Sequence, residues 1–336
     1  MIPEYKYRLR DDSIVTPSFK KWIVAPLFRI IPWWLPANII TIFANMLMYT
    51  ALIFAITEYP VDRTLRFILI PLLILGFTIG DHFDGMQAKR TGTSSALGEL
   101  HDHYLDVFNN GILIFIICLL FQITNPILVA FFLIAGYLPH AVTFFEQFTT
   151  KQLYFDKIGT LESLVLFCAL IAAAAFEPVY HFTLSSSVYG LSVIELSFLI
   201  LSSGAFFTFV KVAWRLSITD LWFWLFNVLL IVVVCLSAIF LKPLSIFYVI
   251  TTYSGLYIGN LQRGHLADGK KRFPDIVVPV FMIAAFLYEP LREVPYIWGL
   301  YIYLTLHTLW IAGNAFWTLR GFWVWKNPTI TKKDNE

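Results

Sequence analysis

The sequence predicts an all-helical, polytopic integral membrane protein with about ten transmembrane helices and an N-terminal amphipathic helix in the membrane interface. Hydrophobic residues make up 58% of the 336 residues and charged residues only 14%, and the mean hydropathy is +0.72. Soluble domains carry about 25% charged residues, so this composition is typical of a bundle of membrane-spanning helices. The three cysteines are too few to indicate a disulfide framework or a zinc site.

Residues 1–38 form the first predicted segment. Lys20 and Lys21 stand among large apolar side chains, and Trp33 and Trp34 follow them. Basic and aromatic side chains gather where a membrane meets water, so we expect a helix that lies in the cytoplasmic interface. The chain starts without an early apolar run, so we expect no cleavable signal peptide.

Residues 39–320 form the predicted transmembrane domain, and residues 321–336 form a cytoplasmic tail. One membrane-spanning helix needs about 17–25 mostly apolar residues. By that measure we expect ten spans, at 39–57, 66–84, 102–123, 127–148, 161–176, 191–212, 220–241, 243–262, 275–289 and 296–319.

The positions of the basic residues predict the orientation of these spans. An even number of spans puts both termini on one side, and 20 of the 24 Lys and Arg residues fall on that side. The positive-inside rule therefore predicts that both termini are cytoplasmic. The membrane would be that of the endoplasmic reticulum or Golgi in a eukaryote and the inner membrane in a bacterium. The net charge of +2 is too small to indicate a nucleic-acid partner.

Four aspartates lie where two predicted spans meet the cytoplasm. Asp81 and Asp84 are three residues apart, and Asp102 and Asp106 are four apart. Each spacing puts two carboxylates on one helix face. Carboxylate oxygens are ligands that Mg²⁺ and Mn²⁺ prefer, and four uncompensated charges at a membrane boundary would be unstable. The spacing therefore predicts a site for hard cations.

From Asp81 to Asp106 the chain reads Asp-x2-Asp-Gly-x2-Ala-Lys-x8-Gly-x3-Asp-x3-Asp. This pattern resembles the signature of the CDP-alcohol phosphotransferase family, with Lys89 where the family usually has arginine. The stretch from Gln87 to Leu100 is most similar to the choline and ethanolamine phosphotransferase branch. That branch usually has a glycine where this chain has Tyr104, between the third and fourth aspartates.

The resemblance implies a metal site and a catalytic base. The four aspartates Asp81, Asp84, Asp102 and Asp106 would bind two Mg²⁺ or Mn²⁺ ions that bridge the diphosphate of a CDP-linked donor. Asp106 would take the proton from the acceptor hydroxyl. A carboxylate beside two cations is a weak base, so His103 is a competing or partner candidate for that role.

The resemblance also implies a CDP-binding pocket beside the aspartates. The small residues Gly85, Ala88 and Gly98 would let the nucleotide approach the backbone closely. Lys89 and Arg90 are candidates for phosphate contacts. Close packing of helices and cytoplasmic anchoring are the alternative explanations for these residue types.

Further candidates lie outside the motif. Glu162 ends a loop that is similar to the one bordering the nucleotide pocket in the choline and ethanolamine branch, so it is a candidate CDP contact. His265 lies where that branch has a histidine, and it is a candidate contact to the acceptor or to a phosphate. Both are otherwise ordinary interfacial residues. Asn38 and Thr41, near the start of the first span, are expected to cap that helix and to have no other role.

The predicted function is transfer of phosphocholine or phosphoethanolamine from CDP-choline or CDP-ethanolamine to diacylglycerol, with release of CMP. A first alternative uses CDP-diacylglycerol as donor and a small polar alcohol as acceptor, but such relatives usually have fewer spans. A second alternative is a cation transporter, which would need acidic residues at several depths, whereas here they form one layer. Small residues on span faces also leave room for a homodimer.

Overall fold

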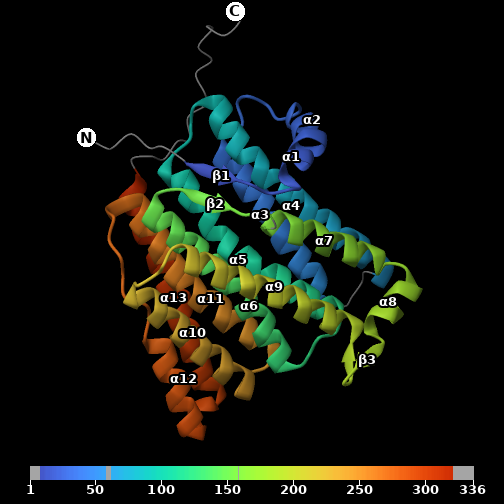
Figure 1. Ribbon diagram of the computed structural model, residues 1–336, viewed down its shortest axis with the longest axis vertical. Coiled ribbons are helices and arrows are strands. Elements are labelled where there is room, and N and C mark those ends of the chain that lie inside the picture. Colours follow the sequence, from blue (N-terminus) through green and yellow to red (C-terminus); the bar gives the residue numbers. More distant parts are fainter. Residues whose placement is uncertain (1–7, 58–61, 158, 321–336) are drawn as a thin grey trace, which may run out of the picture.

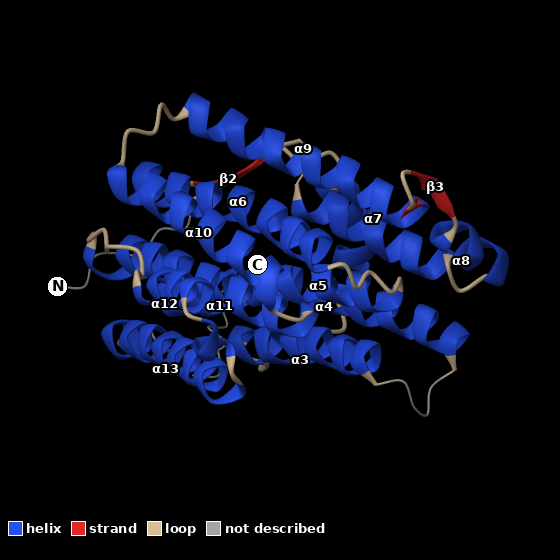
Figure 2. Cartoon of the chain, turned by 90° about the horizontal axis from the view of Figure 1, so that it is seen from below, coloured by secondary structure: helices blue, strands red, loops and turns tan. Residues whose placement is uncertain are grey.

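A computed structural model describes residues 8–57, 62–157 and 159–320 of the chain. Helices make up most of this part and strands occur only as short pieces (Figure 2), so the all-helical class is confirmed. The predicted tail, residues 321–336, lies outside the described residues. In chain order the elements are β1 (Leu9–Asp11), α1 (Thr16–Phe19), the π-helix η1 (Lys20–Val24), α2 (Ala25–Phe28), α3 (Ala37–Ile56), α4 (Arg63–Thr91), α5 (Ala96–Leu120), α6 (Pro126–Thr150), β2 (Leu153–Phe155), α7 (Thr160–Ala173), α8 (Glu177–Leu184), β3 (Ser186–Val188), β4 (Leu191–Ser192), α9 (Val193–Arg215), α10 (Leu221–Phe240), α11 (Pro243–Arg263), the π-helix η2 (Gly264–Asp268), α12 (Val277–Leu287), the 3-10 helix η3 (Glu289–Arg292) and α13 (Val294–Leu319).

Each of the ten predicted spans coincides with a helix, but not all of these helices are long and apolar enough to cross a membrane. Six of those described, α3, α4, α5, α6, α9 and α10, are long and apolar enough. The pair of α7 and α8 is bent by 114° and would make a seventh span if it crosses as one unit. α12 has only 11 residues. The chain is therefore a polytopic integral membrane protein, and the count of ten spans stays a prediction.

The N-terminal segment is helical from Thr16 to Phe28, through α1, η1 and α2. Phe19 and Val24 are buried in a cluster with side chains of α3 and α4, whereas Trp22 is 72% exposed. One side of the segment is thus docked on the bundle and another presents apolar surface. Its predicted location in the membrane interface agrees with this exposure but is not tested by it.

The hairpin of α4 and α5 brings the two halves of the aspartate motif together (Figure 1). Asp62 caps the start of α4 by accepting a hydrogen bond from the Thr64 N–H at 2.9 Å. α4 then continues past the predicted end at residue 84, because the first residue with a left-handed backbone is Gly92, at φ 64°. Ser95 caps α5 by accepting from the Gly98 N–H at 3.1 Å.

α5, α6 and α11 form the buried centre of the bundle. The Tyr137 hydroxyl of α6 donates to the Val107 carbonyl of α5 at 2.9 Å. A Cβ at Gly111 of α5 would lie 2.4 Å from both the Tyr137 oxygen and the Thr251 hydroxyl of α11. Only glycine fits at this junction, and it fixes the level at which the three helices meet.

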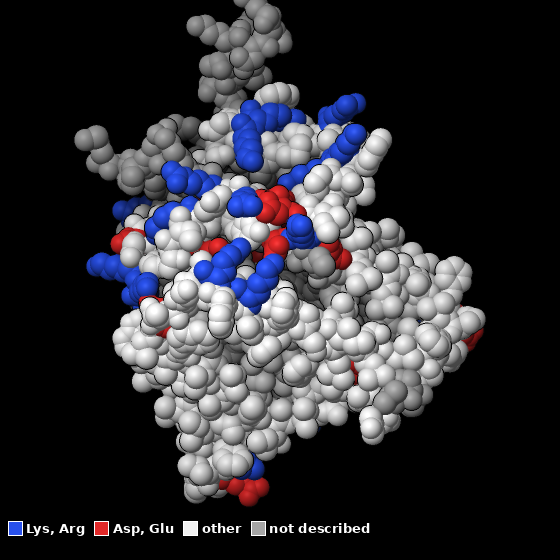
Figure 3. All heavy atoms as spheres, in the orientation of Figure 1, with Lys and Arg blue, Asp and Glu red and all other residues white. Residues whose placement is uncertain are grey.

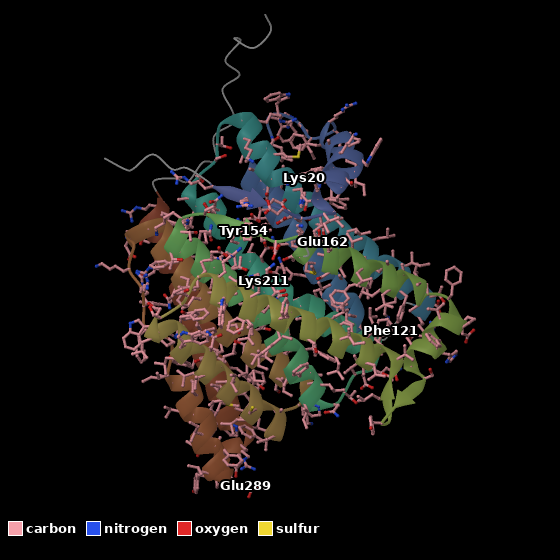
Figure 4. The ribbon with its side chains drawn as sticks, in the orientation of Figure 1. Lys20, Phe121, Tyr154, Glu162, Lys211 and Glu289 are labelled. Atoms are coloured by element: carbon pink, nitrogen blue, oxygen red, sulfur yellow. The ribbon has the colours of Figure 1, made fainter. Side chains whose placement is uncertain are left out.

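Charged side chains gather at one end of the molecule. On the face shown in Figure 3, Lys and Arg cluster with acidic groups near β1 and β2, and most of the remaining surface is uncharged. Glu289 lies at the opposite tip, whereas Lys20, Tyr154, Glu162 and Lys211 lie toward the charged end (Figure 4). The two short strands β1 and β2 pair in parallel at that end.

Candidate active site

Three of the four predicted metal ligands meet between α4 and α5. Asp81, Asp102 and Asp106 each place one carboxylate oxygen within 4.8 Å of the others. Among the described residues these carboxylates form no ion pair with Lys or Arg, and the nearest basic groups are His82, 3.6 Å from Asp81, and His103, 3.8 Å from Asp102. Oxygen-rich, uncompensated clusters are what hard divalent cations require. The side chains present therefore fit Mg²⁺ or Mn²⁺.

Asp84, the fourth predicted ligand, is buried and lies outside this group of three. Its Oδ2 accepts a hydrogen bond from the Thr41 hydroxyl of α3 at 2.6 Å. The prediction that Asn38 and Thr41 only cap α3 is wrong, because the N-cap of α3 is Pro36 and makes no side-chain hydrogen bond. Thr41 lies inside the helix, where its side chain faces α4 and orients Asp84.

A ladder of buried amides supports the aspartates from α3 and α5. Asn45 donates to the Thr41 carbonyl at 2.8 Å, and Asn109 donates to Asn45 Oδ1 at 2.8 Å. Asn109 also lies 3.5 Å from Asp106 Oδ1. The i, i+3 spacing of Asp106 and Asn109 is visible in the sequence, but the link to Asn45 depends on the packing of two distant segments.

His103 lies between two carboxylates in the N-terminal part of α5. Its Nε2 is 3.8 Å from Asp102 and its Nδ1 is 3.9 Å from Glu99 Oε1. Glu99 is itself held by Gln147 of α6, whose amide donates to it at 2.6 Å. The imidazole is buried beside the three-carboxylate group, a position from which it can exchange a proton with a bound substrate.

His265 of η2, far from α5 in the sequence, lies beside the carboxylate of Glu99. Its Nε2 lies 3.9 Å from Glu99 Oε1. Burial, followed by the positive charges of Lys151 and His103, lowers the pKa of His265 to about 4. Burial also lowers the pKa of the Lys151 side chain, which follows α6. The prediction that His265 contacts the acceptor or a phosphate is untested, but its ring does lie at the site.

The small residues of the motif differ in their surroundings. Gly85 is exposed, and a Cβ there would meet no atom within 4 Å, so this side of α4 is open to a ligand. A Cβ at Gly98 would lie 3.3 Å from Ser95 Oγ and 3.4 Å from Asn38 Oδ1, so Gly98 serves helix packing. Ala88 is half-buried and Lys89 is exposed.

Arg90 is directed at the N-terminal segment instead of the aspartates. Its guanidinium donates to the Ile31 carbonyl at 2.8 Å. The group lies 4.4 Å from the ring centre of Phe28 and 4.6 Å from that of Trp33. These contacts favour the anchoring explanation for Arg90 over a phosphate contact.

Glu162 likewise has structural partners for both carboxylate oxygens. Oε1 accepts from the Ser13 hydroxyl at 2.5 Å and from the Val15 N–H at 3.0 Å, and Oε2 accepts from the Gly159 N–H at 2.9 Å. Residues 8–15, which we name the N-terminal strap, are thereby fastened to the start of α7. These bonds favour a structural role for Glu162 over a CDP contact.

Comparison with known proteins agrees with this geometry. The family model for CDP-alcohol phosphatidyltransferase matches residues 34–201, which is half of the chain and includes all four aspartates. The chain belongs to the CDP-alcohol phosphatidyltransferase family. The matched part of the chain runs from just before α3 into α9, and α10 to α13 follow it.

Curated relatives within this family are similar to the chain over part of their length. An uncharacterized CDP-alcohol phosphatidyltransferase class-I family protein of Schizosaccharomyces pombe is 30% identical over 52% of this chain and 46% of its own length. Choline/ethanolaminephosphotransferase 1 of Saccharomyces cerevisiae is 28% identical over 58% of this chain and 52% of its own. Cholinephosphotransferase 1 of the same yeast is 24% identical over 61% and 56%. The chain thus spans about half the length of the curated relatives it matches.

Proposed function

We propose that this chain transfers phosphocholine or phosphoethanolamine from CDP-choline or CDP-ethanolamine to the hydroxyl of diacylglycerol. The observation that carries the proposal is the convergence of Asp81, Asp102 and Asp106 within 4.8 Å, in a chain of this family. The names of the yeast relatives, choline/ethanolaminephosphotransferase and cholinephosphotransferase, support the choice of donor. A new P–O bond forms to the acceptor oxygen, the P–O bond of the diphosphate breaks, and CMP departs with the bridging oxygen.

Two Mg²⁺ or Mn²⁺ ions are held, in this proposal, by Asp81, Asp84, Asp102 and Asp106. When bound, the ions stabilise negative charge on the phosphates and on the departing CMP. Thr41 fixes the carboxylate of Asp84 through the 2.6 Å hydrogen bond, and Asn109 supports Asp106. The carboxylates are therefore oriented before the donor arrives, which reduces the cost of assembling the site.

His103 takes the proton of the acceptor hydroxyl in this proposal, and Asp106 is the alternative base. A carboxylate that binds cations is a weak base, whereas the His103 ring lies beside the metal site and between Glu99 and Asp102. Glu99 would stabilise the imidazolium once the proton has moved. Comparing the pH dependence of His103→Gln with that of Asp106→Asn separates the two assignments.

The CDP group would lie against the open side of α4. Gly85 offers exposed backbone there, and Lys89 offers an exposed positive charge to the phosphates. Ala88 keeps its predicted place as a small residue beside the nucleotide in this proposal, whereas Gly98 serves helix packing. Arg90 contributes by holding the N-terminal segment in place.

We further propose the membrane arrangement in which residues 39–320 cross the bilayer ten times and both termini lie in the cytoplasm. The coincidence of every predicted span with a helix supports the count, and the gathering of basic side chains at one end supports the orientation (Figure 3). The water-soluble donor would then reach the aspartates from the cytoplasm. Diacylglycerol would enter sideways from the bilayer, and a homodimer stays a prediction.

The test is an assay of CMP release by the purified protein. Labelled CDP-choline, CDP-ethanolamine and CDP-diacylglycerol are supplied separately, each with diacylglycerol or with glycerol phosphate, in Mg²⁺, in Mn²⁺ and in excess EDTA. We expect metal-dependent turnover of CDP-choline or CDP-ethanolamine with diacylglycerol. Turnover of CDP-diacylglycerol alone would replace the proposed donor by the first alternative, and equal turnover in EDTA would contradict the metal site.

A further inference from the structure

Tyr104 and Gln262 belong to two tightly packed helices, α5 and α11. A Cβ at Gly259 would lie 2.4 Å from the Tyr104 ring, so the ring fills the space that this glycine leaves. Gln262 is three residues further along the same face of α11. Leu266, the next residue on that face, packs against the cluster that contains Leu100. Gln262 therefore lies between the levels of Leu100 and Tyr104.

The polar ends of the Tyr104 and Gln262 side chains are expected to lie at a similar height along the pair of helices α5 and α11. α5 and α11 are antiparallel, because Gly255 of α11 packs against Phe108 while Gly259 packs against Tyr104. Long side chains on a helix lean toward its N-terminus. Tyr104 thus leans toward the cytoplasmic start of α5, and Gln262 leans back along α11 toward it.

Both side chains are buried and lack hydrogen-bond partners. Tyr104 is 7% exposed and Gln262 is 2% exposed. Within the described part of the chain, the Tyr104 hydroxyl and both polar atoms of the Gln262 amide have no partner. Buried polar groups nearly always have one, so three such atoms at one level call for a ligand.

The chemistry of the pair selects a neutral ligand. A phenol and a carboxamide carry no charge, and each offers an N–H or O–H donor. A carbonyl oxygen has two lone pairs and can accept from both. We infer that Tyr104 and Gln262 form a subsite for an ester carbonyl of the lipid acceptor, an inference that rests on the proposed function for the identity of that lipid.

The subsite lies where it would position the reacting hydroxyl. Tyr104 follows His103 in α5, and His265, one turn after Gln262, lies 3.9 Å from Glu99. In diacylglycerol the ester-bearing carbon is adjacent to the carbon that carries the free hydroxyl. An ester held between α5 and α11 would therefore keep that hydroxyl near His103. α11 lies outside the family match at residues 34–201, so the unmatched half of the chain completes this site.

The experiment measures binding of the acceptor to donor-free protein in detergent, with thermal unfolding as the readout. Dioctanoylglycerol is compared with dioctylglycerol, its ether analogue without carbonyl groups. We expect the wild-type protein to bind the ester about tenfold more tightly than the ether, and Tyr104→Phe and Gln262→Leu to lose this preference. Ser254→Ala is the control, since its buried hydroxyl is also unpartnered but lies eight residues earlier in α11, about 12 Å away.

Two results overturn the inference. One is equal binding of ester and ether by the wild-type protein, and the other is an ester preference that survives in both variants. A merely structural role for the two residues would lower the unfolding temperature without changing the ratio of ester to ether affinity. Because the readout is binding, it decides the inference even if CMP release fails with every CDP donor, which would defeat the proposed function alone.

Discussion

At the scale of single residues, hydrogen bonds between helices hold the site: Thr41 of α3 donates to Asp84 of α4, and Asn109 of α5 donates to Asn45 of α3. The i, i+3 and i, i+4 pairs of aspartates could be assigned to helix faces from the sequence, and three of the four oxygens do meet. Thr41 and Asn45 could not be assigned, because their partners Asp84 and Asn109 lie 43 and 64 residues away. Sequence periodicity shows which residues share a face of one helix, but it does not show which residues of two distant helices are in contact.

The aspartate cluster leads to the first prediction. Asp81→Asn and Asp106→Asn each remove a negative oxygen ligand, and we expect CMP release to fall at least a hundredfold, about 2.7 kcal/mol in the activation free energy. Activity of the wild-type protein should also vanish in EDTA and return with Mg²⁺ or Mn²⁺. Asp268→Asn is the control, since Asp268 pairs with Arg272 on the surface. An Asp106→Asn variant with full, metal-dependent turnover would remove Asp106 from the site.

Thr41 supports the second prediction. Thr41→Val keeps the shape of the side chain but deletes the hydroxyl that donates to Asp84 at 2.6 Å. A hydrogen bond to a charged group contributes about 1.5–3 kcal/mol. We expect turnover to fall about tenfold to a hundredfold, with a larger Mg²⁺ concentration needed for half-maximal rate. Thr50→Val, whose hydroxyl bonds only its own helix at Met46, should change neither quantity.

His265 gives a prediction about pH. Its pKa is lowered from 6.5 to about 4, first by burial and then by nearby positive charge, so the unfolded chain binds a proton more readily than the native one. The contribution of His265 to stability is therefore present above pH 6.5 and is lost as the pH falls toward 4. We expect the unfolding temperature of the wild-type protein to drop between pH 7 and pH 5, and to drop less in His265→Gln. Equal drops in both proteins would contradict this assignment.

At the scale of elements, the sequence predicts which segments are helical better than where they end. Each of the ten apolar runs coincides with a helix, but the span predicted to end at residue 84 continues as α4 to Thr91, because nothing before Gly92 forces the backbone out of the helix. The strands β1 and β2 were not predicted. Three paired residues carry too short a pattern, and their pairing joins segments about 140 residues apart.

The N-terminal strap carries the prediction at this scale. Glu162→Ala removes the acceptor for Ser13, Val15 and Gly159 together, so we expect the free energy of unfolding to fall by about 2–3 kcal/mol. Amide exchange should quicken over residues 8–15 first, because the remaining backbone bonds of the strap are those of a short two-stranded sheet with β2.

The neighbouring pair of Asp156 and Lys211 should keep β2 in place in that variant, since the Lys211 hydrogen bond lowers the pKa of Asp156 and keeps it ionised. Tyr154 and Lys211 lie on this same side (Figure 4). Glu177→Ala, at an exposed residue of α8, is the control. Unchanged exchange over residues 8–15 in Glu162→Ala would show that the hydrogen bonds of Glu162 are not needed to hold the N-terminal strap.

At the scale of the whole molecule, the question is how often the chain crosses the membrane. Composition alone predicted a polytopic helical bundle, and in the part of the chain that the structure describes six helices meet the requirement for length and apolarity. α12 is the difficult case, since 11 residues span about 16 Å and the hydrocarbon core is about 30 Å thick. The helix can connect two sides only if the flanking residues, which include Phe273 and Ile276, also lie in the membrane.

Single cysteines test that crossing. Lys270 precedes α12 and Glu289 follows it, and both side chains are exposed. In a background with Cys235 replaced, an impermeant maleimide should label Lys270→Cys only from the cytoplasm and Glu289→Cys only from the other side. Glu177→Cys should match Glu289→Cys, because ten spans put both on the face away from the termini. If Lys270→Cys and Glu289→Cys were labelled from the same side, α12 would not cross the bilayer and the count would fall below ten. The two termini could then share one side only if α13 also failed to cross.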